Sequence, residues 1–242
     1  MRKLIGEYAI IDAIDDYEMG GKELELSMFI LEIAAEIGRI DTLRKYQKEL
    51  KDENKRKLLR VVAENGHISI LIEMRTNWGL TREDAREHNN FALRRAAARN
   101  HVPVLVELRT NWGLRSDDAR SGDNYALRMS AIYGHTAVLQ ELRTGWELTP
   151  KDVRALQNAA RNGHVDVLVE LRTNWGLARE DARANNNEAL KMTASGGHLD
   201  ILIELRTNWG LTREDVSADN NYALRWAATY GHVPVLVELR TN

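Results

Sequence analysis

A period of about 34 residues runs through this chain and constrains its fold more than any other feature. Five of the six tryptophans recur at intervals of 34, 34, 29 and 34 residues, and six of the seven histidines recur at 34, 34, 29, 34 and 34. A fainter copy lies upstream, where residues 34–46 are similar to residues 62–74. A repeat of this length is one small unit that buries its apolar face against the next unit. The sequence therefore predicts a stack of about seven units, one of them degenerate. The recurring residues are Trp78, Trp112, Trp146, Trp175 and Trp209, with His67, His101, His135, His164, His198 and His232.

One unit reads NNFALRRAAARNHVPVLVELRTNWGLTREDAR and carries two helical patterns. In the first, Leu93, Ala96 and Ala97 share one narrow side, where small alanines permit close contact between helices. In the second, Val104 and Leu108 are spaced to face the same core. The predicted fold class is therefore all-α, a helical repeat solenoid with a pair of short antiparallel helices in each unit.

The ends of the predicted first helices carry residues suited to caps. Glycine follows the helix in most units and asparagine in one, and both tolerate the left-handed conformation of a C-terminal cap. Asparagine also precedes the helix in four units, where an N-cap is expected. The C-terminal positions are Gly66, Asn100, Gly134, Gly163, Gly197 and Gly231, and the N-terminal ones are Asn90, Asn124, Asn187 and Asn221.

Residues that recur in every unit are expected to serve stacking. We interpret the histidines as hydrogen-bonding backbone at the turn between the two helices, because ligands one unit apart would lie about 10 Å from each other and could not share a metal ion. The tryptophans are interpreted as packing beneath the connector. The Glu-x-Arg pairs, from Glu73 and Arg75 to Glu238 and Arg240, are predicted to lie on a solvated face.

The pattern resembles the ankyrin repeat. The alanine pair, as in Ala96-Ala97, and the Gly-His step, as in Gly66-His67, match that family, while Tyr125-Ala126-Leu127-Arg128 replaces its threonine-proline-leucine-histidine opening. This variant looks like the diverged ankyrin arrays of giant viruses and intracellular microbes. The resemblance covers roughly residues 27–242 and implies a scaffold that binds other proteins through a concave groove lined by the first helices.

The connector departs from the resemblance, because the glycine-alanine-aspartate finger of ankyrin repeats is missing. Thr81, followed by Asp84 three residues later, approximates a capping box, so we predict a short third helix in place of the β-hairpin finger. The polar linker of the other units is deleted between Arg154 and Ala155, which accounts for the 29-residue spacing. One continuous helix over residues 150–162 is predicted there.

The chain is expected to contain three parts. Residues 1–26 form an N-terminal helical extension or cap, residues 27–57 a degenerate capping repeat, and residues 58–242 six ankyrin-type repeats. The fourth junction is shortened at residues 149–155 and the last repeat is incomplete. That last repeat is apolar to its end, which predicts either a longer parent array or self-association through an uncapped C-terminal end.

Composition excludes several kinds of site. The formal net charge is -2 and there is no cysteine, so thiolate metal sites, disulfides and a cysteine nucleophile are excluded. No glycine-rich phosphate loop or metal-type spacing stands apart from the period, so neither a cofactor nor a metal nor a catalytic residue is predicted. No apolar run approaches the ~18 residues of a membrane span. We expect a cytoplasmic protein, or one in the host cytoplasm if the chain comes from a virus or an intracellular microbe.

Positions that vary between units are free to contact a partner. By the helical period, Arg95 and its counterparts lie on the side of the first helix opposite Leu93. Met, Tyr, Trp and Arg are enriched at protein interfaces. The alternative is that the connector helices fold over this side and bury it as core. The candidate partner-binding residues are Arg95, Arg99, Met129, Ile132, Tyr133, Arg161, Asn162, Met192, Trp226 and Tyr230.

The predicted function is a non-catalytic protein–protein interaction scaffold that binds its partner through these residues. One alternative is a structural or engineered array without a native ligand, since LRTNWGLTRED is nearly identical between units. A less favoured one is binding of a nucleic acid or another polyanion through stacked arginines, against which the net charge argues. Those arginines are Arg94, Arg128 and Arg225, with Arg99 and Arg161.

Overall fold

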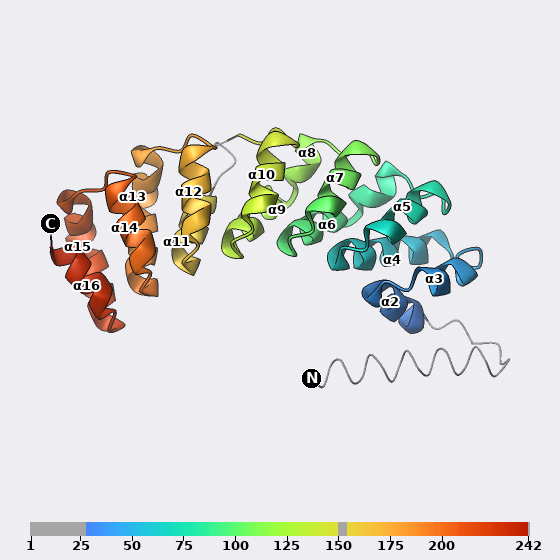
Figure 1. Cartoon of the computed structure of the whole chain (residues 1–242), viewed down its shortest axis with the longest axis horizontal. Helices are drawn as coiled ribbons and strands as arrows, with labels where there is room; N and C mark the ends of the chain where they lie inside the picture. Colours follow the sequence, from blue (N-terminus) through green and yellow to red (C-terminus); the bar gives the residue numbers. More distant parts are fainter. Residues whose placement is uncertain (1–27, 150–153, 242) are drawn as a thin grey trace.

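A computed structural model describes residues 28–149 and 154–241, and within these residues it contains α-helices and no strand. Helices α2 to α16 follow one another along a curved arch, from blue at the N-terminal side to red at the C-terminal side in Figure 1. The predicted N-terminal extension, residues 1–26, lies outside the described residues. The helices are α2 (Met28–Ile37), α3 (Ile40–Tyr46), α4 (Asp52–Asn65), α5 (Ile68–Thr76), α6 (Arg82–Ala98), α7 (Val102–Thr110), α8 (Ser116–Ala119), α9 (Ser121–Ile132), α10 (Thr136–Thr144), α11 (Ala155–Asn162), α12 (Val165–Thr173), α13 (Arg179–Gly196), α14 (Leu199–Thr207), α15 (Arg213–Thr229) and α16 (Val233–Arg240).

The helices form seven pairs, which confirms the predicted all-helical solenoid. Each pair packs on the next through its first helix, in the order α2, α4, α6, α9, α11, α13 and α15. From α5 onward the second helices also contact one another, in the order α5, α7, α10, α12, α14 and α16. The core runs along the whole stack, because every described unit contributes buried residues to it.

The core residues predicted for the unit formed by α6 and α7 are buried. Leu93, Ala96, Ala97, Val104 and Leu108 are all 0% exposed. Burying one leucine side chain contributes roughly 2 kcal/mol, and buried leucines recur in every unit of the stack. The five recurring tryptophans are also buried, at 2–6% exposure, which confirms that they serve packing.

Each recurring histidine joins two units. Because a carbonyl oxygen can only accept a hydrogen bond, the histidine Nε2 donates to the backbone carbonyl near the end of the preceding first helix. The histidine series therefore bonds backbone, as predicted, but across the junction between units. The pairs are His67 with Glu36 at 2.7 Å, His101 with Glu64 at 3.0 Å, His135 with Ala98 at 3.2 Å, His164 with Ile132 at 2.7 Å, His198 with Arg161 at 2.8 Å and His232 with Ser195 at 2.9 Å.

The glycine that ends a first helix lies directly beneath the histidine of the next unit. Gly66 has φ +79°, and a Cβ there would lie 2.7 Å from Cε1 of His101. Gly163 has φ +77° and would meet His198 in the same way. The left-handed caps predicted from these glycines are thus confirmed, and the close approach of the ring gives a second reason for glycine.

The short helix in the connector is confirmed where the sequence predicts it. The backbone N–H of Thr81 donates to Asp84 Oδ2 at 2.7 Å, and the Thr81 hydroxyl donates to the same oxygen at 2.8 Å. Helix α6 begins at the next residue, Arg82. An acidic residue at this point also suits the positive end of the helix dipole.

The prediction that Asn90 is a side-chain N-cap is wrong. His88, Asn89 and Asn90 are three consecutive left-handed residues, with φ of 51°, 60° and 56°, inside the span of α6. Asn90 Oδ1 is buried without a hydrogen-bond partner, so asparagine serves here for its tolerance of positive φ. Oδ1 is likewise unpartnered in Asn124 and Asn187, while Asn221 shares the left-handed backbone with φ 57°.

Arginine caps this left-handed turn. Arg94 Nε donates to the carbonyl of Asn89 at 2.8 Å, and Arg94 NH2 donates to the carbonyl of His88 at 3.0 Å. Arg128 donates to the carbonyl of Gly122 at 3.1 Å in the equivalent turn of α9. These bonds satisfy carbonyl oxygens of the turn.

The shortened fourth junction differs from the prediction. Helix α11 begins at Ala155, and Arg154 has φ −93° and ψ 17°, outside the helix. One continuous helix over residues 150–162 is therefore wrong at Arg154, and residues 150–153 lie outside the described residues. The unit still forms a separate first helix, because Ala155, Leu156, Ala159 and Ala160 are buried against α9 and α13.

The Glu-x-Arg positions do not lie on a fully solvated face. Glu107, Glu170 and Glu204 are buried, and the arginine of one unit reaches the glutamate of the next. Arg75 Nε lies 3.0 Å from Glu107, and Arg172 Nε lies 3.1 Å from Glu204. The charges therefore attract across each junction, and the earlier interpretation as a row of solvated charges is wrong.

Candidate binding face

We call the side of the first helices that carries the ten candidate residues the first-helix face. No candidate on it is buried. Tyr133 is 55% and Tyr230 is 54% exposed. The alternative that connector helices cover these residues is therefore wrong. Arg99, Arg161 and Asn162 are exposed as well, while Arg95, Met129, Ile132, Met192 and Trp226 are half-buried.

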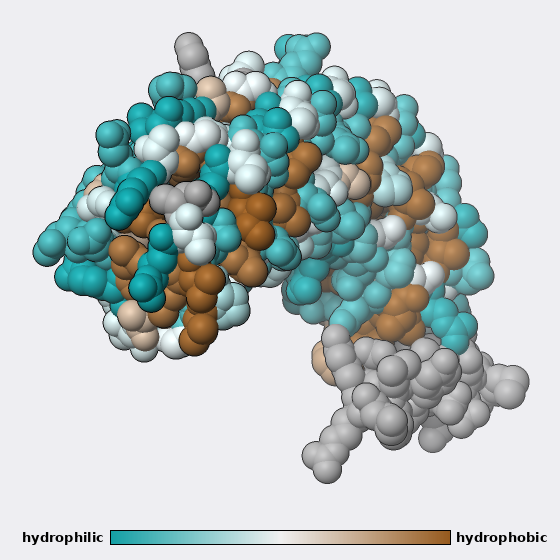
Figure 2. Space-filling view, turned by 60° about the vertical axis from the view of Figure 1, so that its left-hand side comes forward, coloured by the Kyte–Doolittle hydropathy of each residue, from teal (hydrophilic) through white to brown (hydrophobic). Residues whose placement is uncertain are grey.

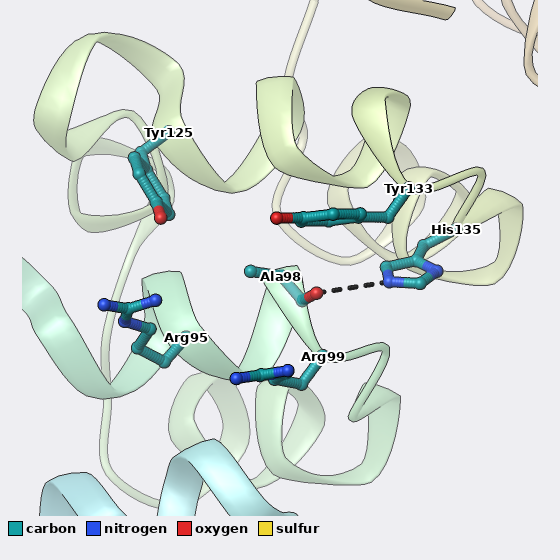
Figure 3. A pocket seen from close by; sticks show the side chains of 6 residues that line it. All are labelled: Arg95, Ala98, Arg99, Tyr125, Tyr133 and His135. Atoms are coloured by element: carbon teal, nitrogen blue, oxygen red, sulfur yellow. Dashed lines mark hydrogen bonds between the residues drawn. The ribbon is translucent and has the colours of Figure 1, made fainter. Parts of the chain in front are cut away.

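A pocket of about 420 Å³ lies on this face between α6 and α9. Figure 3 shows Arg95 of α6 and Arg99, which directly follows α6, at one side of the space and the rings of Tyr125 and Tyr133 at the other. The pocket thus combines two cations with two phenol groups. Its lining residues are Arg95, Ala98, Arg99, Tyr125, Tyr133 and His135.

His135 forms one end of the pocket and contributes no positive charge to it. Burial lowers the pKa of this imidazole, although the hydrogen bond to the Ala98 carbonyl acts in the opposite direction. The dashed line in Figure 3 marks that bond, which is 3.2 Å long. The ring is therefore neutral near pH 7, with its Nε2 proton already donated.

A second hollow of about 540 Å³ lies between the preceding units. Arg99 borders both hollows, and its NH2 lies 3.4 Å from Glu64. The second hollow contains carboxylates and the first contains none, so the two differ in the chemistry they offer. The residues that line the second hollow are Glu36, Val61, Glu64, Asn65, Arg99 and His101.

The last unit carries an aromatic row on the same face. The ring centroids of Tyr222 and Trp226 are 5.4 Å apart, and those of Trp226 and Tyr230 are 5.1 Å apart and stacked. Figure 2, which brings the C-terminal end of the arch forward, shows apolar residues gathered there. Val233 and Val237 of α16 are 62% and 56% exposed.

The structure places some candidate residues in one pocket, whereas others bond to a residue outside it. Arg95, Arg99 and Tyr133 share the pocket between α6 and α9. Arg161 Nε instead lies 3.2 Å from the sulfur of Met192, and Asn162 Nδ2 donates to the carbonyl of Asn158 at 2.8 Å. The ten residues therefore form several local patches and not one continuous site.

The arginines proposed for polyanion binding do not form a free strip. Arg94 and Arg128 are used by the left-handed turns, and Arg94 also stacks 4.9 Å from the ring centroid of Tyr125 in the next unit. Arg225 lies 5.9 Å from the ring centroid of Tyr222. A nucleic acid backbone would need several unengaged cations in register, and in the described part of the chain Arg94 and Arg128 are engaged within the stack.

Sequence reasoning missed two residues of the pocket, Tyr125 and His135. Tyr125 begins a helix whose opening residue varies between units, as Phe91 and Glu188 show at the same position. That variation was a usable signal, whereas His135 is indistinguishable in sequence from the other recurring histidines. It lines the pocket because Tyr133, two residues earlier, is large and exposed beside it, with ring centroids 5.8 Å apart.

Two further findings bear on the chemistry of the described residues. Among residues 28–149 and 154–241, no group of three or more histidine, cysteine or acidic residues is arranged to hold a metal ion. Within the same residues, no helix is both long and apolar enough to cross a membrane.

Searches against protein families and against curated protein sequences find no match to the chain. A search of solved structures finds an X-ray structure of an ankyrin repeat family protein from Legionella pneumophila. The two sequences are 19% identical and the TM-score is 0.44. The match covers 90% of the present chain and 70% of the Legionella protein. The fold assignment rests on the chain's own paired helices, since a likeness of this size carries no argument about function.

Proposed function

We propose that the chain is a non-catalytic scaffold that binds another protein through the first-helix face. One observation carries this proposal: recurring residues are used in stacking, whereas the varying candidates remain at the surface. His101 and Glu107, for example, are engaged between units, while Tyr133 is 55% exposed. A scaffold of this kind keeps a constant frame and varies its contact residues.

The test compares two sets of substitutions in the whole chain. The face variant changes Met129, Tyr133, Trp226 and Tyr230 to alanine. The control variant changes three exposed apolar residues of the second helices to alanine, namely Ile72, Val169 and Ile203, which are 39%, 36% and 39% exposed. Each protein is immobilised as bait for a lysate of the source organism, and captured proteins are quantified by mass spectrometry.

We expect the face variant to lose specific captured proteins and the control variant to keep them. Thermal unfolding is measured alongside, because lost binding is informative only if the midpoint is retained. Equal capture by both variants, with the midpoint of the face variant retained, would contradict the proposal.

The proposal includes a cytoplasmic location, which is the host cytoplasm if the chain comes from a virus or an intracellular microbe. Fractionation of cells that express the tagged chain tests this part. Self-association through the last unit also stays a prediction, supported by the exposure of Val233 and Val237. Light scattering over a range of concentrations tests it, and a mass that stays at one chain would rule it out.

A further inference from the structure

The pocket between α6 and α9 is positively charged. Two of its six lining residues are arginines and none is acidic. Within the described residues, Arg95 makes no ion pair, and its guanidinium carbon instead lies 5.1 Å from the ring centroid of Phe91. A guanidinium held by an aromatic ring keeps its N–H donors available for an anion.

Arg99 is held only weakly by the protein. Its NH2 lies 3.4 Å from Glu64, and its side chain is 62% exposed. Exposed ion pairs of this kind contribute little to stability, so a ligand can compete for the guanidinium. Both arginines can therefore turn toward an anion in the pocket.

The tyrosines supply the remaining donors. Figure 3 shows the phenol oxygens of Tyr125 and Tyr133 turned toward the space enclosed by the labelled residues. His135 adds no donor, because its Nε2 proton is bound to the Ala98 carbonyl. The pocket thus offers two guanidinium groups and two hydroxyl groups to one small acceptor-rich group.

The surroundings favour a single anion over a polymer of anions. Arg94 and Arg128, which flank the pocket along the stack, are hydrogen-bonded to backbone carbonyls. On the side of the preceding unit the face turns acidic at Glu64, and farther along α9 it is apolar at Met129 and Ile132. A phosphate chain would find one cationic site here and no continuation.

We propose that this pocket receives an aspartate or glutamate side chain of a partner protein, held between the guanidinium groups of Arg95 and Arg99. The inference rests on the proposed function and specifies the chemistry of the partner. Bidentate pairing of guanidinium with carboxylate is directional, so it sets the register of a bound segment as well as its affinity.

The experiment selects short peptides from a random phage-displayed library on the whole chain. A double variant, Arg95→Met with Arg99→Met, removes both charges while retaining the aliphatic stems. The matched control, Arg213→Met with Arg240→Met, removes the same charge from exposed arginines outside the pocket. Peptides enriched on the unaltered chain are synthesised with a fluorescent label, together with copies in which each Asp or Glu becomes Asn or Gln.

We expect the enriched peptides to share an acidic position. Their dissociation constants should rise roughly 10- to 100-fold for the Arg95 and Arg99 double variant, and similarly for the amide copies, because a charge-assisted bidentate contact is lost. The charge-matched control should bind within about twofold of the unaltered chain, as rim charges contribute little.

The other outcomes separate this inference from the proposed function. Peptides that bind without an acidic residue, and that lose binding when Tyr133 becomes alanine, would overturn the carboxylate assignment and leave the proposed function standing. A labelled single-stranded oligonucleotide that binds with a steep salt dependence, while no peptide is enriched, would overturn both. Equal binding of acidic peptides by both double variants would refute the pocket as their site.

Discussion

The contact between Gly66 and His101 allows a sharp test of how the units are joined. We predict that Gly66→Ala destabilises the chain through two separable effects. The first is backbone strain, because Gly66 has φ +79°. The second is steric, because the new Cβ would lie 2.7 Å from Cε1 of His101 and displace the ring that bonds the Glu64 carbonyl at 3.0 Å.

The magnitudes follow from these two effects. A left-handed alanine costs about 1 kcal/mol or slightly more relative to glycine. Loss of the histidine hydrogen bond adds about 0.5–1.5 kcal/mol, and more if the carbonyl oxygen is left without a partner. Gly66→Ala should therefore reduce the free energy of unfolding by roughly 2–3 kcal/mol, whereas in a His101→Ala background the same change should cost only the strain, about 1 kcal/mol.

Urea unfolding followed by far-ultraviolet circular dichroism gives the four free energies of this cycle, provided the slopes with denaturant agree. Gly231→Ala is a useful comparison, because Gly231 has φ +73° with nothing within 4 Å of an added Cβ. It should show strain alone. A cost of Gly66→Ala that is the same with and without His101 would refute the reasoning, since the coupling energy would then be zero.

Three further outcomes are expected. Asn100→Gly should stabilise the chain by a few tenths of a kcal/mol, because glycine adopts the φ of 62° more readily than asparagine. Urea midpoints measure this. Glu107→Gln should lower the free energy of unfolding by about 1–2 kcal/mol, because it removes the negative charge that lies 3.0 Å from Arg75 Nε across the junction. A urea midpoint unchanged from the parent would contradict a stabilising role for these ion pairs between units. Burial lowers the pKa of His101 and of His135 in the folded chain. Below the ordinary histidine pKa of 6.5 the unfolded chain therefore binds more protons than the folded chain, and the thermal midpoint should fall. This stabilisation is complete above pH 6.5 and is lost as the pH falls toward the folded pKa values. Changing both His101 and His135 to glutamine should flatten that part of the plot of thermal midpoint against pH.

The helix pairs and their turns could be predicted from sequence because each depends on local chemistry. Gly66 and Asn100 mark the same C-terminal cap because both residues tolerate positive φ. Thr81 and Asp84 mark a helix start because the capping box needs only those two residues at that spacing. Because these capping residues recur with the period, a wrong assignment in one unit can be recognised by comparison with the others.

Contacts between units could not be predicted in the same way, because they join residues that are 28 to 37 positions apart. Asp118 shows the difficulty: Arg86 Nε reaches it at 2.7 Å from the previous unit, and the backbone N–H of Arg115 donates to it at 2.8 Å. Burial alone would raise the pKa of Asp118, but these hydrogen bonds outweigh it and hold the pKa below its ordinary value. A pattern that shows charge every 34 residues does not reveal whether neighbouring charges repel in solvent or pair across a junction.

The candidate residues follow from the same division. Glu107 and His101 are needed by the adjacent unit, so a change at either position disturbs two units at once. The guanidinium of Arg95 lies over the ring of Phe91 in its own helix, so Arg95 can change without breaking a junction between units. A stack built in this way separates the residues that hold the units together from those that contact a partner. The cost of altering a contact residue should therefore appear in binding and not in unfolding, which the face variant and its control test by measuring capture together with the thermal midpoint.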